Sequence, residues 1–246
     1  MLIGRVRTAT GETLWVRTEG GRMLAIEDPF AAHAAGRAPE DVAGAPPVTG
    51  ELLAPCEPFV VVGIAQNGPE HPSPVQAWLK SPRGVIASGA EVTLRRDAGR
   101  TVAEGEIAVV IGRETTGLTE ATAADFVLGI TAVNDLSSPD RALVDPRNFE
   151  SKSGAGYTPL GPWIDTSARI DDVALRVSVD GELVAETDAG ALPSSIARCL
   201  AYLAAWTTLG PGDVVMTGAP FSQAEIAPGQ TVVIEVGVAR LVTPTR

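Results

Sequence analysis

Two glutamates stand near the start of a strongly apolar segment, and this pattern limits what the chain can fold into. Residues 102–112 read Val-Ala-Glu-Gly-Glu-Ile-Ala-Val-Val-Ile-Gly and predict a buried strand. Because successive side chains of a strand point to opposite faces, Glu104 and Glu106 share one face. An unpaired carboxylate buried in an apolar interior is very unfavourable. The two glutamates therefore either face solvent on an edge strand or are buried together with a cation.

A second apolar segment, residues 127–135, predicts another strand and ends at an aspartate. If the two strands are neighbours, Asp135 can provide a third carboxylate beside Glu104 and Glu106. Three hard oxygen donors with room for water suit Mg²⁺, Mn²⁺ or Ca²⁺ better than Zn²⁺. The sequence thus indicates a divalent-cation site where these strands meet.

Composition excludes several classes of function. The chain has 246 residues and a formal net charge of −11, whereas nucleic-acid and membrane-surface binders need basic patches. No apolar run approaches the 18 residues of a membrane span, and the N-terminus has no pattern of a signal peptide. The two cysteines, Cys56 and Cys199, lack metal-binding spacing, so we expect reduced, packed thiols and a cytoplasmic protein.

Turn and strand signals suggest two parts of the chain. Residues 1–28 alternate in short β-like pieces around a Gly20-Gly21 hairpin signal, a short helix is predicted within residues 29–40, and Pro46-Pro47 marks a connector. We therefore predict a small N-terminal domain over residues 1–50 and a main domain over residues 51–246.

Further elements are predicted along the main domain. Strands are expected at residues 173–179 and 183–187, joined by an Asp180-Gly181 turn. A helix capped by Thr119 is expected over residues 119–125. The clearest helix covers residues 194–206, where apolar spacing places Tyr202 and Trp206 in the core or in an interface.

Five blocks of sequence, in one order, resemble the fumarylacetoacetate hydrolase family. They are residues 104–112, 129–135, 152–153, 159–163 and 209–220. The resemblance implies an α+β, β-rich fold with a mixed β-sheet roll and a small N-terminal β domain. It also implies a homodimer and one divalent cation, Mg²⁺ or else Mn²⁺ or Ca²⁺, whose family ligands match Glu104, Glu106 and Asp135. The family often has a Ser-Ala-Arg-Asp-like run after the last of these, which makes Asp140 an alternative ligand.

The resemblance also assigns roles to other residues. Lys152 matches a catalytic-site lysine, which can hold a developing enolate oxygen or the substrate carboxylate. Lys80 matches a lysine before a proline and is a candidate substrate contact, with Arg83 as a second cationic candidate. Thr217 matches a threonine that helps bind a substrate carboxylate, together with the Gly218 N–H. Tyr157 is expected to line the pocket.

The chain departs from the family pattern at the residues that activate water. The family has a histidine on a short helix and a glutamate about three residues later, whereas here His71 follows Glu70 directly and is flanked by prolines. His71 and Glu70 are still candidate catalytic residues, and a surface-loop histidine is the alternative. Asn67 or Gln66 in the same Pro-rich segment could instead orient the substrate by hydrogen bonding.

These residues predict an enzyme acting on a small 2-oxo carboxylate. Such an acid chelates a divalent ion, which acts as a Lewis acid and stabilises an enolate. The resemblance implies hydrolysis of a C–C bond in an acylpyruvate or fumarylacetoacetate-like acid, as in aromatic catabolism. Two alternatives stay open. One is isomerisation or decarboxylation of a 2-hydroxydienedioate or oxaloacetate-like acid, and the other is a non-catalytic protein that binds metal and an oxo acid.

Overall fold

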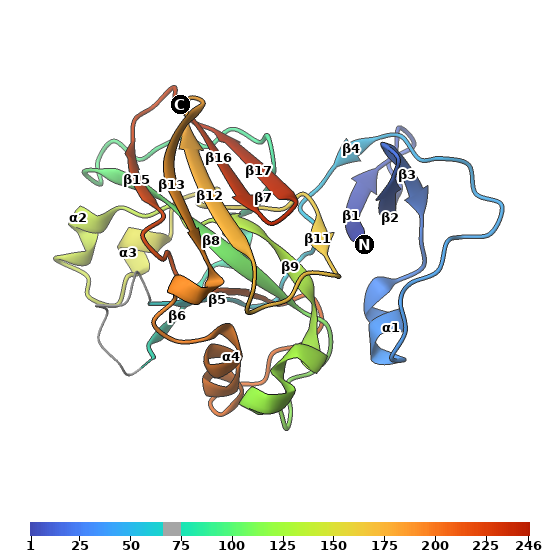
Figure 1. The fold of residues 1–246 in the computed structure, drawn as a ribbon. Helices are drawn as coiled ribbons and strands as arrows, with labels where there is room; N and C mark the ends of the chain where they lie inside the picture. The colour runs from blue at the N-terminus through green and yellow to red at the C-terminus, as the bar shows by residue number, and fades with distance from the viewer. Residues whose placement is uncertain (66–74) are drawn as a thin grey trace.

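The fold is built mainly from β-strands. The computed structural model describes residues 1–65 and 75–246, and its helices are few and short. Figure 1 shows the larger body of crossing strands, with the N-terminal strands and first helix set to one side of it. The predicted β-rich α+β fold is confirmed. Every helix in the two described ranges is too short or too polar to span a lipid bilayer.

The larger of two sheets carries most of the conspicuous sequence blocks. Within the described residues it has thirteen strands, and its main path runs β3-β2-β1-β11-β9-β8-β14-β5-β6. The strands are β1 Leu2–Arg7, β2 Thr13–Glu19, β3 Arg22–Ala25, β4 Glu51–Leu52, β5 Val61–Ile64, β6 Ala77–Lys80, β7 Val85–Ala87, β8 Thr101–Ile111, β9 Val127–Asn134, β10 Thr158–Leu160, β11 Ile164–Asp165, β14 Val214–Met216 and β15 Gln223–Ile226. The sheet is mixed, because β14–β5 and β10–β7 are parallel while the ladders on β8 are antiparallel.

This sheet curls back on itself around β9. β9 pairs with β8, and β10 pairs with both β9 and β7. β7 follows β6 after the short 3-10 helix η1, Pro82–Gly84. The path from β9 through β8, β14, β5 and β6 therefore returns to β9 through β7 and β10, as a roll requires. The closure carries Lys80, at the end of β6, back toward the end of β9.

A four-stranded antiparallel sheet packs on β8 and β9. Its order is β13-β12-β16-β17, formed by β12 Ala174–Val179, β13 Glu182–Asp188, β16 Thr231–Val236 and β17 Ala239–Pro244. The two sheets approach closely at Gly105, where a Cβ atom would lie 2.4 Å from Val177 Cγ2 and 3.4 Å from Ile234 Cγ1. The residue between the two glutamates is therefore a glycine because the second sheet leaves no room for a side chain.

The side chains of β8 divide between two cores. Ile107 and Val109 pack in the core that the four-stranded sheet covers, while Ala108 and Val110 pack in a second core on the other face. Glu104 and Glu106 have the parity of Ala108, so they lie on the face of β8 away from the four-stranded sheet. Because β8 lies between β9 and β14, the edge-strand alternative for these glutamates is wrong.

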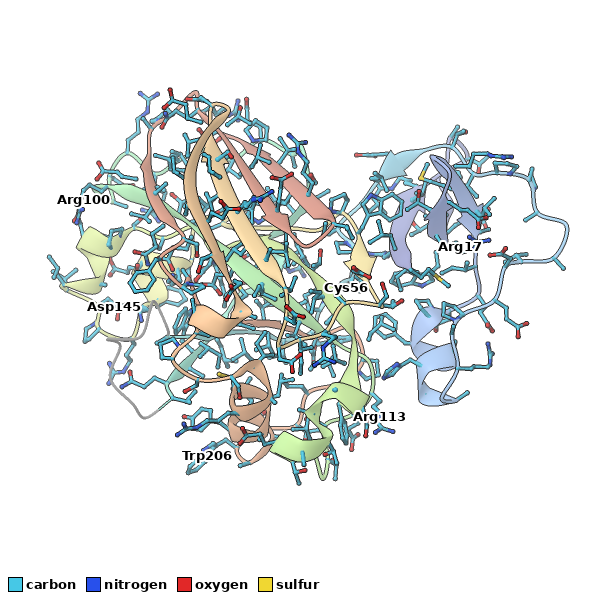
Figure 2. All side chains as sticks on the ribbon, viewed as in Figure 1. Arg17, Cys56, Arg100, Arg113, Asp145 and Trp206 are labelled. Atoms are coloured by element: carbon cyan, nitrogen blue, oxygen red, sulfur yellow. The ribbon has the colours of Figure 1, made fainter. Side chains whose placement is uncertain are left out.

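The longest helix, α4, lies at the lower edge of the body in Figure 1. The predicted helix over residues 194–206 is α4, Ile196–Ala204, capped by Ser195, which accepts a 3.1 Å hydrogen bond from the Arg198 N–H. Trp206 lies beyond the end of α4 and is 80% exposed, so its predicted core position is wrong, and Figure 2 shows its ring at the periphery. Its alternative role in an interface stays a prediction.

The other helices are single turns or slightly longer. The predicted helix capped by Thr119 is the 3-10 helix η2, Glu120–Phe126, and a capping box between Thr119 and Thr122 closes its start. The remaining helices are α1 Pro29–Ala34, α2 Pro139–Ala142, α3 Phe149–Lys152 and η3 Ala189–Ala191. Cys56 and Cys199 are both reduced and both buried, as predicted.

The N-terminal segment forms an antiparallel meander. β2 and β3 are joined at Gly20 and Gly21, whose positive φ values of 57° and 76° explain the two glycines. β1 pairs with β2 and β4, and it also pairs with β11 of the larger body. The division into residues 1–50 and 51–246 stays a prediction.

Candidate metal and substrate site

Three carboxylates converge where β8 and β9 lie side by side. In the β8–β9 ladder Glu106 is paired with Val133, and the Asp135 N–H donates a 2.9 Å hydrogen bond to the Glu104 carbonyl. This register puts Asp135 beside both glutamates. Carboxylate oxygens of Glu104, Glu106 and Asp135 all lie within 4.8 Å of one another. We call these three residues the carboxylate cluster.

The Glu106 carboxyl is fully buried and contacts the turn after β14. Its Oε2 accepts a 2.7 Å hydrogen bond from the Gly218 N–H. Burial, followed by the negative charges of Asp135 and Glu104, raises the pKa of the Glu106 carboxyl well above its usual range. Without a further cation nearby, the cluster therefore favours a proton on Glu106.

Lys80 is held inside the protein by three acceptors. Its ammonium donates to Asp135 Oδ1, to the Tyr157 carbonyl at 2.6 Å and to the Leu136 carbonyl at 3.2 Å. An ammonium has three N–H groups, so these three acceptors satisfy all of them. Burial lowers the pKa of Lys80, and the charge of Asp135 opposes this effect. In the described part of the chain, all three N–H groups of Lys80 are therefore bonded to protein acceptors. Its contact with a substrate stays a prediction.

Lys152 lies at the end of α3 and contacts the other side of the cluster. Its Nζ donates to Asp135 Oδ2 at 2.6 Å and to Glu104 Oε2 at 3.1 Å. The same ammonium lies 5.1 Å from the centroid of the Trp78 ring, within the range of a cation–π contact. Burial disfavours the charged form, but the carboxylates of Asp135 and Glu104 outweigh it and raise the pKa of Lys152.

Asp135 is thus the residue on which both ammonium groups meet. Burial by itself would raise the pKa of the Asp135 carboxyl, but the neighbouring charges of Lys152 and Lys80 hold it below its usual value. Two ammonium groups face three carboxylates, so the group as a whole can still attract positive charge.

Several of these residues were not anticipated from the sequence. Ser137 donates a 2.6 Å hydrogen bond to Glu104 Oε1 and so orients that carboxylate. Trp78, on β6, packs against Gly63 and under Lys152, and its Nε1 is buried without a hydrogen-bond partner in the described part of the chain. The sequence contains one signal for the site that was not used: the chain has only two lysines, Lys80 and Lys152. In the structure both of them donate to Asp135.

The predicted carboxylate-binding turn lies next to Glu106. Thr217 directly follows β14, and its hydroxyl donates a 2.9 Å hydrogen bond to the Ile107 carbonyl. Gly218 has a φ of 99°, which aims its N–H at Glu106, and a glycine suits this left-handed conformation. Both predicted substrate donors are therefore engaged within the chain. Their role toward a substrate stays a prediction.

The remaining candidates fall elsewhere. Gln66, Asn67, Glu70 and His71 lie outside the described residues. Tyr157 is buried, and its hydroxyl accepts a 3.0 Å hydrogen bond from the Arg95 N–H. Asp140, the alternative metal ligand, is instead paired with Arg100 at 2.9 Å and is not part of the cluster.

A cavity of about 250 Å³ opens beside Lys152. Lys80, Arg83, Lys152, Ser153 and Thr158 are among its lining residues. We call it the Lys152 cavity. A larger crevice of about 580 Å³, lined by His33 and Arg113, lies at the opposite end of β8 and β9. Unlike that crevice, the Lys152 cavity is lined by the two lysines that donate to Asp135.

The cluster fits a hard divalent cation by its donor set. All three members provide carboxylate oxygens, the ligands that Mg²⁺, Mn²⁺ and Ca²⁺ prefer. Glu106 supplies the clearest indication, because it is buried beside two other carboxylates and has no ammonium partner among the described residues. A cation between these oxygens would offset the repulsion that now favours a proton there.

Comparison with known proteins identifies a family for this chain. A sequence model described as "Fumarylacetoacetate (FAA) hydrolase C-terminal" matches residues 57–244. Protein Rv2993c of Mycobacterium tuberculosis is 32% identical over 205 residues, which make up 78% of this chain and 77% of that protein.

Two further relatives have names that state an activity. The 4-hydroxyphenylacetate degradation bifunctional isomerase/decarboxylase of Salmonella dublin is 40% identical over 144 residues, 56% of this chain. The match spans about a third of that protein's length, 34%. The crystal structure of 5-carboxymethyl-2-hydroxymuconate delta-isomerase from Mycobacterium smegmatis has a TM-score of 0.89 at 31% identity, and the match covers 100% of this chain and 99% of that one. Because the family model matches residues 57–244, the chain belongs to the fumarylacetoacetate hydrolase family of enzymes.

Proposed function

We propose that this protein is a divalent-metal-dependent enzyme that converts a small 2-oxo acid, or the 2-hydroxydienoic acid that is its enol form. The observation that carries the proposal is the convergence of three carboxylates and both lysines of the chain at the ends of β8 and β9. Glu104, Glu106 and Asp135 would hold the cation, and we propose Mg²⁺, with Mn²⁺ or Ca²⁺ as alternatives. Bound there, the ion would supply Lewis-acid polarisation of a 2-oxo acid.

The residues of the chain have separable tasks in this proposal. The Lys152 ammonium neutralises the negative charge that develops on the substrate oxygen during enolisation. Lys80 is a positioning residue that holds the Asp135 carboxylate in one orientation. Ser137 and the Gly218 N–H do the same for Glu104 and Glu106. Each carboxylate of the cluster is thus oriented by a donor of the chain, which favours a pre-formed ion site.

Isomerisation or decarboxylation is the reaction that we place first. The relative from Salmonella dublin is named an isomerase/decarboxylase and the structure from Mycobacterium smegmatis an isomerase. Both reactions pass through an enolate and need no activated water. Sequence reasoning placed C–C hydrolysis narrowly first, and the names of these relatives support the opposite order.

Hydrolysis of an acylpyruvate is the second candidate. It requires a base that activates water. In the described residues, the histidine is His33, and it lines the crevice at the far end of β8 and β9. A hydrolytic route therefore depends on His71 or Glu70, outside the described residues.

One assay separates these reactions from each other and from a non-catalytic role. The metal-free protein, prepared with EDTA, is given Mg²⁺ and then acetylpyruvate, oxaloacetate or a 2-hydroxydienedioate, and products are identified by mass. Unchanged mass with an altered absorbance spectrum indicates isomerisation, release of CO₂ indicates decarboxylation, and two carboxylic acids indicate hydrolysis. If Mg²⁺ binds but none of the three substrates is converted, the enzymatic proposal is wrong and a binding protein is favoured. The homodimer stays a prediction that sedimentation can test.

A further inference from the structure

We propose that Trp78 is the positioning residue of Lys152, and that the face of its indole ring holds the Lys152 ammonium in place while a divalent cation occupies the carboxylate cluster. This inference rests on the proposed function, because it assumes that the cation and a 2-oxo acid bind at the cluster. It assigns a task in the reaction to an aromatic residue outside the cluster.

The ring of Trp78 is packed against a glycine of the neighbouring strand. Trp78 on β6 is paired with Gly63 on β5, and a Cβ atom at Gly63 would lie 2.5 Å from the ring carbons Cε2 and Cζ2. The indole therefore occupies the space that a side chain at position 63 would need. Trp78 and Lys80 are two positions apart on β6, so both side chains project to the side where Lys80 contacts Asp135.

The face of this ring carries the Lys152 ammonium. Nζ of Lys152 lies over the ring at 5.1 Å from its centroid, and the Lys152 side chain is 9% exposed. Among aromatic side chains tryptophan attracts a cation most strongly, and the attraction grows when the cation is shielded from water. Both conditions are met at this contact.

The indole N–H does not explain why a tryptophan stands here. Its Nε1 is buried and has no hydrogen-bond partner within residues 1–65 and 75–246. A buried donor without an acceptor is unfavourable, and phenylalanine at this position would avoid it. The property that favours tryptophan is the stronger attraction of its face for a cation.

An aromatic face differs from the other partners of Lys152 in one respect. Nζ of Lys152 donates to Asp135 Oδ2 and to Glu104 Oε2, and both of these residues are proposed ion ligands. A divalent cation would compete for the same oxygens and repel the ammonium. Hard cations prefer oxygen ligands, so the indole face stays available to Lys152. Trp78 thus keeps the ammonium beside the cluster, where it can face a substrate oxygen.

The position of the ammonium can be measured directly, because the chain has only two lysines. Protein that is isotope-labelled at lysine alone gives two sets of side-chain NMR signals, and Lys152→Met identifies the set from Lys152. An indole ring current shifts protons above its face upfield. We expect the methylene next to Nζ of Lys152 to be shifted upfield in EDTA and to stay shifted at saturating Mg²⁺. Trp78→Leu should remove this shift, whereas the control Trp206→Leu should leave it unchanged.

Fluorinated tryptophans test the ring face while they leave the packing nearly unchanged. Each added fluorine withdraws electron density from the face and weakens its attraction for a cation. Mono-, di- and trifluorinated tryptophans are placed at position 78, and kcat and KM are measured with the substrate that the Mg²⁺-loaded wild-type protein converts. We expect kcat to fall stepwise, by roughly tenfold in total, while KM and the melting temperature stay unchanged. The same series at Trp206, which is 80% exposed, should leave kcat unchanged.

The outcomes separate a positioning role from packing and from failure of the proposed function. If kcat does not depend on the number of fluorines, or if the melting temperature falls together with kcat, the ring serves packing only and the inference is wrong. It is also wrong if Mg²⁺ abolishes the upfield shift of Lys152. If the wild-type protein converts no substrate, the proposed function is overturned, and the lysine spectra alone then decide whether Trp78 holds Lys152.

Discussion

Replacement of Lys80 by methionine tests how the carboxylate cluster is held together. Methionine is unbranched and close to lysine in length, so Lys80→Met removes the ammonium while it leaves most of the packing in place. The change deletes the bonds to Asp135, to the Leu136 carbonyl and to the Tyr157 carbonyl. Among the described residues, Asp135 then retains only Lys152 as a cationic partner.

The magnitude follows from the burial of this ion pair. The side chains of Lys80 and Asp135 are 2% and 0% exposed. Removal of one member of such a buried pair typically lowers the free energy of unfolding by about 3–5 kcal/mol. Each kcal/mol shifts the melting temperature of a chain of this size by roughly 2–4 °C. We therefore expect Lys80→Met to melt roughly 6–20 °C below the wild-type protein in EDTA.

A divalent ion should reduce this difference. The ion supplies positive charge to the same carboxylate, and a ligand that binds only the folded protein raises its stability by mass action. Because Lys80→Met removes a competing cation, its cluster should bind the ion more tightly and gain more stability. The gap in melting temperature between variant and wild type should therefore narrow at saturating Mg²⁺.

Thermal and urea unfolding, both followed by circular dichroism with EDTA and then with Mg²⁺, measure the melting temperature and the free energy of unfolding. Arg22→Met is the matched control, since Arg22 is exposed and its loss should change the free energy of unfolding by less than about 0.5 kcal/mol. A loss below about 1 kcal/mol for Lys80→Met in EDTA would refute the view that Lys80 stabilises a buried charged Asp135. An equal loss with and without Mg²⁺ would refute the link to the ion site.

Four further predictions test other parts of the molecule. Glu106→Gln should weaken Mn²⁺ binding by roughly 100-fold, as measured by electron paramagnetic resonance. The control Glu182→Gln changes an exposed glutamate and should leave Mn²⁺ affinity unchanged; equal affinities of the two variants would contradict the ion site. Lys152→Met should bind Mn²⁺ about tenfold more tightly, because a cation that competes for the same carboxylates is gone. The variant should nevertheless lose substrate turnover, and weaker Mn²⁺ binding would contradict the proposed role of Lys152 beside the ion. Gly105→Ala should lower the free energy of unfolding by about 1–3 kcal/mol, because the new methyl carbon would lie 2.4 Å from a β12 side chain; an unchanged urea midpoint argues against the close sheet contact. Burial raises the pKa of the Cys56 thiol to about 12, so peptide mapping should find this thiol unlabelled by a thiol reagent at pH 8 until urea unfolds the protein; rapid labelling of the native protein would show that the thiol is accessible.

Much of the site could be predicted from local sequence. The alternation along residues 102–112 puts Glu104 and Glu106 on one face whatever the partner strands are, because the pattern depends only on the geometry of an extended chain. The unfavourable burial of two carboxylates then indicates a cation. The structure brings Asp135 and Lys152 to the same place, as the resemblance implied.

Sequence reasoning was weaker where a contact depends on distant segments. Lys80 precedes Asp135 by 55 positions, and only the return of the sheet through β7 and β10 puts its ammonium on that carboxylate. Trp206 continues the apolar spacing of the helix before it, yet the helix ends at Ala204, and the ring lies outside. A local pattern shows which side chains share a face but does not show where the element ends or what covers it.

The sequence by itself determined that this chain is β-rich and that two glutamates share a strand face, where they either face solvent or are buried with a cation. These conclusions follow from composition, strand periodicity and the unfavourable burial of charge, which are properties of short segments. Only the tertiary structure decided that β8 is a central strand, that both lysines meet on Asp135 and that Arg83 and Thr158 share a cavity. Those arrangements depend on which strands pair across long stretches of chain, and that pairing is set by the packing of the whole sheet.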